Sequence, residues 1–369
     1  MGYTVHTEQV ATGTNVKTTI QNAYNANSNL LYVQLVGDWT EIKSDLGTSQ
    51  NAPMDPVLGC VAGSDNYPEL IIGRFSASTT EDVTVQVNKT INYEKNPDIG
   101  GTWYSNGLGI GSPDGSGIGD DGEIDYDHID VIKDNKLLPN TYDTVNEAYG
   151  TPSSTTVAGF INAGLSVINY CGHGDKTYWV TSGYSNTNIG SSTNGNMLPF
   201  IFSVACVNGQ FNTGECFGEA WLKKSNGGAV AALMATINQP WVPPMRGQDY
   251  INDILTGGYN YSVNPGSGTS TTSVDHRTSY GSIALNGNVL MLVEAPTDVS
   301  TQETIKTWTI FGDASLQVRT DQPLDIENSN SILFIGNYST TITSAGNPIE
   351  NAKVTLYQDG ENFTAMTNS

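Results

Sequence analysis

Two apolar runs of the same kind, each ending in a turn, constrain the fold of this chain more than any other feature. LSVINYCGHG leads to His173, LPFIFSVACVNG leads to Cys206, and both runs stop at turns that contain Gly or Asn. Short apolar runs rich in β-branched and aromatic residues are typical of buried strands in an α/β sheet. Ligands of open α/β sheets bind outside the carboxyl ends of such strands. We therefore expect one strand to place an imidazole at this edge and the next to place a thiol.

The chemistry of this pair competes with a simpler interpretation. A single Cys after an apolar strand is usually a small core residue, and a single His is more often structural than catalytic. Together, however, a Cys and a His can supply a thiolate nucleophile and its general acid or base. Gly172 and Gly174 flank His173, and glycine permits close approach of a substrate. The spacing alone leaves a Cys–His enzyme and a packed core as alternatives.

The rest of the pattern predicts alternating strands and helices, with 369 residues sufficient for two domains. Helices are expected within residues 14–27, 79–97, 127–138, 156–164, 215–228 and 250–258. Thr79 or Thr80 is expected to cap the second helix, followed by acidic residues in its first turn. Further strands are expected at 3–10, 30–38, twice within 57–75, and at 106–112, 229–237 and 307–320.

Three domains follow from this pattern. Residues 1–100 and 101–320 are expected to form two α/β subdomains, the second holding the Cys and the His. A polar stretch at 262–273 interrupts the second of them. From residue 321 the sequence alternates with period two, which predicts an immunoglobulin-like β domain over 321–369. At about 48 residues it is shorter than the roughly 100 of a full sandwich, and we expect a small or truncated domain.

Charge and cysteine usage restrict the possible partners. The chain has 37 Asp+Glu against 15 Lys+Arg, a net charge of -22, which disfavours nucleic acid and anionic membranes and favours cationic peptides and divalent cations. Solubility in a salty or extracellular setting is the simpler explanation of the same charge. No apolar run is long enough for membrane insertion. The four cysteines show neither a disulfide framework nor a CxxC metal pattern.

Two acidic clusters are candidate sites. Asp65, Tyr67 and Glu69 alternate on a turn, and such oxygen ligands suit Ca²⁺, although a solvated turn explains them as well. The second cluster lies in a Gly-rich loop, where one carboxylate could orient His173 and another could form the floor of a pocket for a basic side chain. Composition does not say which of them do so: Asp114, Asp120, Asp121, Glu123, Asp125 and Asp127.

The motifs HGxxxxW (His173–Trp179) and VACVNGxF (Val204–Phe211) resemble the gingipain family of cysteine endopeptidases, which has a caspase-like fold. The resemblance covers most of residues 1–320 and extends to the segments LLYVQLVGD, DNYPELIIGRFS, TINYEKN, DDGEIDYDHI, ATINQPWVPPMRGQD and TWTIFGDASLQVRT. It implies a catalytic unit of mostly parallel sheets flanked by helices. It also implies a secreted or cell-surface protease that is made as a zymogen.

The resemblance also implies a role for each site residue. Cys206 would be the nucleophile, and His173 would protonate the leaving amine and then activate water. The backbone N–H groups of Gly174 and Cys206 would form the oxyanion hole. Asp114 stands where the family has the acidic residue that orients the His.

A basic residue at P1 of the substrate is implied by the pocket positions. Asp125 matches the aspartate of the arginine-specific members, and a carboxylate can pair with a guanidinium through two hydrogen bonds. The lysine-specific branch has its acid just before the pocket Trp, where this chain has Pro240, so we expect Arg over Lys. Cys171 replaces a Thr of the relatives, which leaves the polarity of the pocket open. The S1 residues implied are Asp125, Trp241, Met245, Cys171 and Val204.

The family's structural Ca²⁺ site maps onto the carbonyls of Ala62 and Tyr67 and the carboxylates of Asp65 and Glu69. The relatives' catalytic unit begins with a strand and a helix that would precede Gly2, so we expect a propeptide or a separate N-terminal segment. The expected partners are protein or peptide substrates.

Two other functions remain open. One is a transpeptidase of the same fold that attaches surface proteins, since some relatives join proteins to anchors. The other is a non-enzymatic, calcium-dependent adhesion module, which the acidity and the β-rich end of the chain favour.

Overall fold

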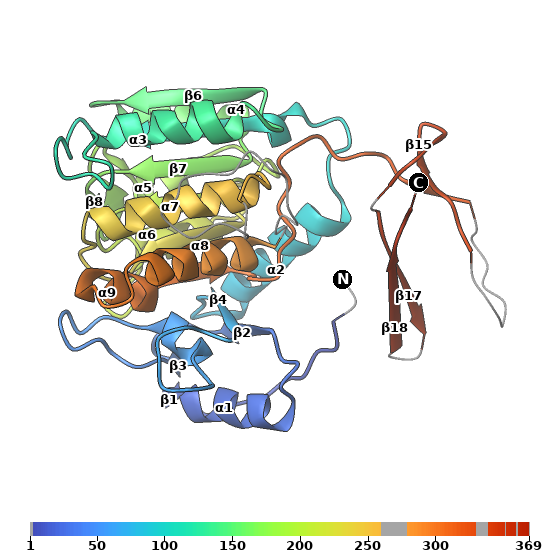
Figure 1. The fold of residues 1–369 in the computed structure, drawn as a ribbon, viewed down its shortest axis with the longest axis horizontal. Helices are drawn as coiled ribbons and strands as arrows, with labels where there is room; N and C mark the ends of the chain where they lie inside the picture. Colours follow the sequence, from blue (N-terminus) through green and yellow to red (C-terminus); the bar gives the residue numbers. More distant parts are fainter. Residues whose placement is uncertain (1–2, 260–278, 330–338, 351, 359–360, 369) are drawn as a thin grey trace. The chain divides into compact units, whose positions relative to one another are not determined.

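A computed structural model describes residues 3–259, 279–329, 339–350, 352–358 and 361–368. The chain divides into two compact units (Figure 1). The larger unit comprises residues 11–97 and 102–321, and the smaller comprises residues 1–10, 98–101 and 322–369. The polar stretch at 262–273 lies outside the described residues.

The larger unit is built on one eight-stranded sheet. Its neighbouring strands are parallel except β12 and β13, which are antiparallel, so the mostly parallel sheet expected from the sequence is confirmed. Residues 1–100 contribute β2 and β4 to the same sheet as residues 101–320. In spatial order the strands are β2 (Tyr32–Val36), β4 (Ile71–Phe75), β13 (Trp308–Gly312), β12 (Ala231–Ala235), β11 (Phe200–Val204), β7 (Val167–Cys171), β5 (Asn106–Gly111) and β6 (Thr144–Tyr149).

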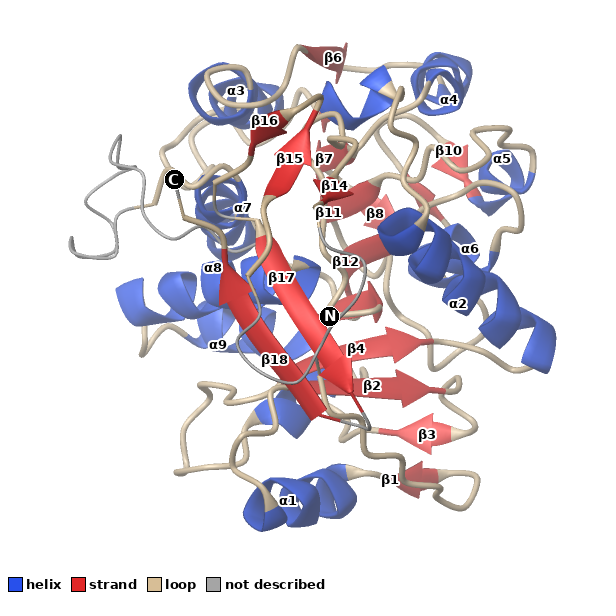
Figure 2. Ribbon diagram, turned by 90° about the vertical axis from the view of Figure 1, so that its right-hand side faces the viewer, coloured by secondary structure: helices blue, strands red, loops and turns tan. Residues whose placement is uncertain are grey.

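Helices cover both faces of this sheet (Figure 2). One face carries α3 (Asp125–Ile132), α7 (Val242–Leu255), α8 (Tyr280–Glu294) and α9 (Val299–Thr307). The other face carries α2 (Thr80–Lys95), α4 (Ser154–Ala163), α5 (Asn186–Gly190) and α6 (Phe217–Lys223).

The core is divided by the sheet into two hydrophobic clusters. Along β11, Phe200 and Phe202 belong to one cluster and Ile201 to the other, because successive side chains of a strand point to opposite faces. All five residues of β11 are buried. A strand covered on both faces explains why its sequence is apolar throughout rather than alternating.

Smaller elements complete this unit. The helix α1 (Lys17–Ala26) lies near a short parallel pair, β1 (Thr14–Asn15) and β3 (Ile42–Lys43). Three short antiparallel strands follow β7: β8 (Gly174–Asp175), β9 (Tyr178–Trp179) and β10 (Tyr184–Ser185). The 3-10 turns Asp55–Gly59 and Thr102–Ser105 and the π-turn Lys133–Leu137 complete the set.

Local chemistry explains several of the helix boundaries. The Thr79 side chain accepts a hydrogen bond from Asp82 N–H (3.1 Å), while the Asp82 carboxylate accepts one from Thr79 N–H (3.1 Å). This reciprocal capping box fixes the start of α2, and the prediction that Thr79 or Thr80 caps this helix is confirmed.

Other sequence-based expectations were wrong. Residues 3–10 are irregular and mostly exposed, since alternation alone does not supply a strand to pair with. The first strand expected within 57–75 is the 3-10 turn at 55–59, which has Pro56 in its first positions, where proline is favoured in a helical turn. The helix expected at 250–258 begins at Val242, with a proline again in its first turn. The helix expected at 127–138 is α3 followed by the π-turn.

The smaller unit consists of β structure, as the period-two pattern predicts. Its elements are a three-stranded antiparallel sheet and a hairpin, formed by β14 (Glu327–Asn328), β15 (Ile342–Ser344), β16 (Asn347–Pro348), β17 (Lys353–Gln358) and β18 (Glu361–Met366). Part of the same pattern, residues 330–338, lies outside the described residues. None of the helices within the described part of the chain has the length and apolarity needed to cross a bilayer.

Candidate active site

The carboxyl ends of β7 and β11 bring the His and the Cys to one edge of the sheet. These strands are parallel neighbours whose register pairs Cys171 with Val204. His173 lies two residues beyond Cys171, and Cys206 lies two residues beyond Val204. The strand register therefore brings the imidazole and the thiol to the same edge of the sheet, as the sequence predicts.

The backbone of Gly174 packs directly against the backbone of Cys206. A Cβ atom added at Gly174 would lie 2.2 Å from the carbonyl oxygen of Cys206 and 2.9 Å from its nitrogen. Only glycine fits at such a distance. The two residues expected to form an oxyanion hole are thus in contact through main-chain atoms.

The Cys206 thiol is partly buried, and its environment affects its acidity. Burial raises the pKa of this thiol, while hydrogen bonds with the backbone of Gln239 and Gly174 partly lower it. The sulfur lies 3.9 Å from the carbonyl oxygen of Gln239. The thiolate therefore forms less readily than that of a free cysteine.

The turn that holds Cys206 is strained and clamped. Val207 has a φ of 46°, a region that is costly for a β-branched residue. Its N–H donates to the carbonyl of Ile237 (2.8 Å), and the N–H of Ala205 donates to the side-chain oxygen Oε1 of Gln239 (3.0 Å). Residues that follow β12 thus fix the turn on both sides of the cysteine.

His173 has the acidic partner that was expected for it. Its Nε2 lies 3.4 Å from Oδ2 of Asp114, and both side chains are about half exposed, at 46% and 55%. The imidazole meets the Trp241 ring edge to face, with 5.1 Å between the ring centroids. The carbonyl of His173 accepts a hydrogen bond from the Tyr170 hydroxyl (2.6 Å), which anchors the backbone at this position.

Asp125 is a completely buried carboxylate at the start of α3. Its Oδ2 accepts from the Ser112 hydroxyl (2.5 Å) and its Oδ1 from Nε1 of Trp241 (2.9 Å). Burial raises the pKa of Asp125, and hydrogen bonds from Ser112, Trp241 and the Cys171 thiol lower it. These donors are all neutral, so none of them supplies a positive charge to the carboxylate.

The other S1 candidates lie in or against one hydrophobic cluster. Cys171, Val204 and Met245 are buried in one hydrophobic cluster, and Trp241 is partly buried against it. Trp241 joins the two halves of the site, because it contacts both His173 and Asp125. Cys171 supplies a thiol donor to the carboxylate, as a threonine hydroxyl could.

The candidate calcium loop lies between the 55–59 turn and β4. Oε2 of Glu69 accepts from the N–H groups of Val61 (2.8 Å) and Ala62 (2.9 Å), and Oδ1 of Asp65 accepts from Tyr67 N–H (3.0 Å). These bonds hold both carboxylates in one loop and leave Oε1 of Glu69 and Oδ2 of Asp65 for a ligand. Hard oxygen donors of this kind fit Ca²⁺.

Sequence reasoning did not single out Ser112 and Gln239. Ser112 follows β5 directly, as His173 and Cys206 follow their strands at a short distance, so the same rule about strand ends points to it. Gln239 belongs to the NQPW segment just before the pocket tryptophan, but its contact with the Cys206 turn is visible only in the structure.

Comparisons with known proteins identify the family of this chain. The model of peptidase family C25 matches residues 3–319. Gingipain R2 of Porphyromonas gingivalis is 36% identical over 307 residues, which are 81% of this chain and 39% of that protein. The crystal structure of the Arg-specific cysteine proteinase gingipain R has a TM-score of 0.83 at 33% identity, covering 96% of this chain and 79% of that chain.

A complex of Porphyromonas gingivalis RgpB pro- and mature domains gives the same TM-score of 0.83 at 32% identity, over 96% of this chain and 81% of that chain. The chain spans about two fifths of the curated relative it matches, 39% of its length. The fold is that of the gingipain catalytic domains, and the family resemblance of the sequence motifs is confirmed. This chain belongs to peptidase family C25.

Proposed function

We propose that this chain is a cysteine endopeptidase that cleaves peptide bonds after basic residues, preferring arginine to lysine. The observation that carries the proposal is the buried Asp125 carboxylate beside the edge that presents His173 and Cys206. The relatives support it, because one is named gingipain R2 and a matching structure is described as Arg-specific.

The reaction follows from the arrangement of the site. The Cys206 thiol gives its proton to His173 as its sulfur attacks the scissile carbonyl carbon, and the N–H groups of Gly174 and Cys206 stabilise the oxyanion that forms. His173 protonates the leaving amine as the C–N bond breaks, which gives a thioester. It then takes a proton from water, whose oxygen attacks the thioester. The C–S bond breaks, the free acid leaves, and the proton passes from His173 back to the sulfur of Cys206. Asp114, 3.4 Å from the imidazole, orients the ring.

Arginine fits the pocket better than lysine does. Ser112 and Trp241 each hold one oxygen of Asp125, so the carboxylate is fixed in a plane that can accept two N–H groups of a guanidinium. An ammonium group is a point charge without this fork geometry. Pro240 stands just before Trp241, so this position supplies no second carboxylate.

We also propose a structural Ca²⁺ at Ala62, Asp65, Tyr67 and Glu69. The donor set, two carboxylates and backbone carbonyls in one loop, supports this proposal. When bound, the ion would brace the loop that leads into β4.

Secretion and a zymogen stage are part of the same proposal. The strongly acidic composition suits an extracellular protein, and a complex of pro- and mature domains among the relatives supports a propeptide.

The test is hydrolysis of a fluorogenic peptide panel that differs only at P1, with Arg, Lys, Asp or Leu, in the presence of Ca²⁺ and a reductant. Cys206→Ala should abolish cleavage. Asp125→Asn should lower kcat/KM for the Arg peptide by about 10²- to 10⁴-fold, since each of two charged hydrogen bonds contributes about 1.5–3 kcal/mol. Asp127→Asn is the matched control, because Asp127 is exposed on the same helix.

Each failure of this test has a distinct meaning. An unchanged preference for Arg in Asp125→Asn would overturn the pocket assignment while keeping the protease. Full activity of Cys206→Ala would overturn the mechanism. With an added amine nucleophile, a ligated product in place of the free acid would identify a transpeptidase. A Cys206 no more reactive to a thiol label than the other cysteines, in a protein without cleavage, would favour the adhesion module.

A further inference from the structure

A set of buried hydrogen bonds joins the loop after β11 to the hairpin after β7. The hairpin strands β8 and β9 pair Asp175 with Tyr178. The side-chain amide nitrogen of Asn208 donates to the carbonyl oxygens of both residues, that of Asp175 at 2.5 Å and that of Tyr178 at 3.2 Å. One side chain from the loop that carries Cys206 therefore binds both strands of the hairpin that begins at Gly174.

The orientation of the Asn208 amide is fixed by its partners. Carbonyl groups only accept hydrogen bonds, so the NH₂ group faces the hairpin and Oδ1 faces Ser203. The Ser203 hydroxyl donates to this Oδ1 (3.3 Å) and accepts from the indole N–H of Trp179 (3.0 Å). All three side chains are completely buried. Because Trp179 is itself part of β9, the chain of hydrogen bonds returns to the hairpin from which it started.

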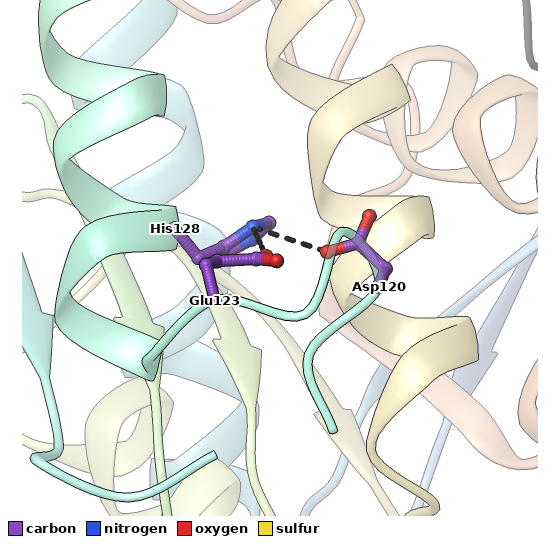
Figure 3. Close-up of side chains that lie close together, drawn as sticks. All are labelled: Asp120, Glu123 and His128. Atoms are coloured by element: carbon purple, nitrogen blue, oxygen red, sulfur yellow. Dashed lines mark ion pairs between the residues drawn. The ribbon is translucent and has the colours of Figure 1, made fainter. Parts of the chain in front are cut away.

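Every side-chain nitrogen and oxygen in this network has a hydrogen-bond partner. The cluster of Asp120, Glu123 and His128, which is joined by ion pairs (Figure 3), differs in this respect. Neither side-chain oxygen of Asp120 has a hydrogen-bond partner among the described residues. Fully paired buried networks hold their members in one arrangement. The network around Asn208 therefore has the property expected of a group that fixes geometry.

The first turn of α6 holds the same two loops through the main chain. The N–H of Gly218 donates to the carbonyl of Asn208 (3.0 Å), and the N–H of Phe217 donates to the carbonyl of Lys176 (2.7 Å) in the turn of the hairpin. The side chain of Asn208 and the start of α6 thus fix the two loops in one relative position.

These two loops carry the N–H groups that would stabilise the oxyanion. Gly174 is next to Asp175 in the chain, and Cys206 lies two residues before Asn208. Oxyanion-hole donors act through their preorganised positions, so their spacing matters. We propose that Asn208 is a positioning residue that sets the distance between the N–H groups of Gly174 and Cys206. The proposal rests on the peptidase function proposed above.

The test compares Asn208→Ala with the control Asn212→Ala. Asn212 follows in the same loop and also donates its side-chain amide to a main-chain carbonyl, but to that of Asn51 (3.0 Å). In Asn208→Ala, kcat for the Arg peptide should fall about 10²-fold, because misplacement of about 1 Å costs about that much. Its KM and the rate of Cys206 alkylation by iodoacetamide should change less than about threefold. All three values should stay within about threefold of the parent in Asn212→Ala.

Hydrogen exchange tests the same contact without cleavage. In a Cys206→Ala background, mass spectrometry should show the amides of residues 174–179 exchanging at least about tenfold faster in Asn208→Ala, and within about threefold of the parent rate in Asn212→Ala. If the parent cleaves no peptide, the proposed function fails, and the exchange rates still decide whether Asn208 holds the hairpin.

Three results would overturn the proposal: parental kcat in Asn208→Ala, equal losses of kcat and alkylation rate, or unchanged exchange in the hairpin. A lower melting temperature with parental kcat would show a purely structural role. If Asn208→Ala does not fold, Ser203→Ala tests the same network, because it removes the donor to Oδ1 of Asn208. Loss of this one hydrogen bond should lower kcat about fivefold at constant KM, and parental kcat in that variant would refute the positioning role.

Discussion

Replacing Gly174 by alanine should remove most of the catalytic rate without removing the nucleophile. The new Cβ would lie 2.2 Å from the Cys206 carbonyl oxygen, whereas real Cβ atoms essentially never come within 3.0 Å of another atom. The two backbones must therefore separate by about 0.8 Å. Misplacement of about 1 Å, or loss of one oxyanion-hole donor, costs about 10²-fold or more in rate. We expect kcat to fall about 10²-fold and KM to change less than threefold.

The assay pairs peptide cleavage with alkylation of the thiol. Iodoacetamide reacts with the Cys206 thiolate without forming an oxyanion, so its rate in Gly174→Ala should stay within about threefold of the parent rate. Gly159→Ala is the control, because Gly159 lies in α4 and a Cβ there would meet no atom within 4 Å. A Gly174→Ala protein with parental kcat would refute the assignment of this backbone to the oxyanion hole. Equal losses of cleavage and alkylation would show that the variant disturbs the thiol itself.

The remaining predictions concern the core, the acidity of the nucleophile and its turn. Asp55→Asn should destabilise the fold by about 3–5 kcal/mol in urea unfolding, because it breaks a buried pair with Arg74 whose Nε lies 2.6 Å from Oδ2; a loss below about 1 kcal/mol would contradict this. Alkylation of Cys206 should keep accelerating above pH 9, since burial raises its pKa above the ordinary value; a plateau below pH 7 would show a thiolate–imidazolium pair instead. Gln239→Leu removes the acceptor of the Ala205 N–H and should lower kcat about tenfold at constant KM. Gln239→Glu keeps the acceptor and should retain a higher kcat than Gln239→Leu. Equal kcat values in the two variants would exclude a positioning role for the Gln239 side chain.

The sequence was sufficient to place His173 and Cys206 at one edge of the sheet. A strand buried on both faces must be apolar along its whole length, so its end is visible as the first polar turn. Both residues follow such ends, and parallel neighbours in register bring them together. The cap at Thr79 could be predicted for a similar reason, because a capping box involves residues only three apart.

The rest depends on contacts that no local pattern records. The apolar run of β13 is the same whether the strand runs parallel or antiparallel to β12. Oε1 of Gln248 lies 3.2 Å from Nε2 of His128, although the two residues are 120 positions apart in the chain. Trp241 reaches Asp125 across 116 positions. The acidic loop could be identified as unusual, but the choice among its carboxylates required the positions of these distant partners.

The reversal between β12 and β13 has a consequence for how this family can be extended. Gly312 at the end of β13 pairs with Ala231 at the start of β12, so the chain leaves the sheet at the edge opposite the one that presents Cys206. Sequence added after β13 can therefore lengthen, diversify or recombine in evolution without passing through the loops that carry the chemistry. Because β13 runs antiparallel to β12, sequence downstream of β13 can change independently of the loops that follow β7 and β11.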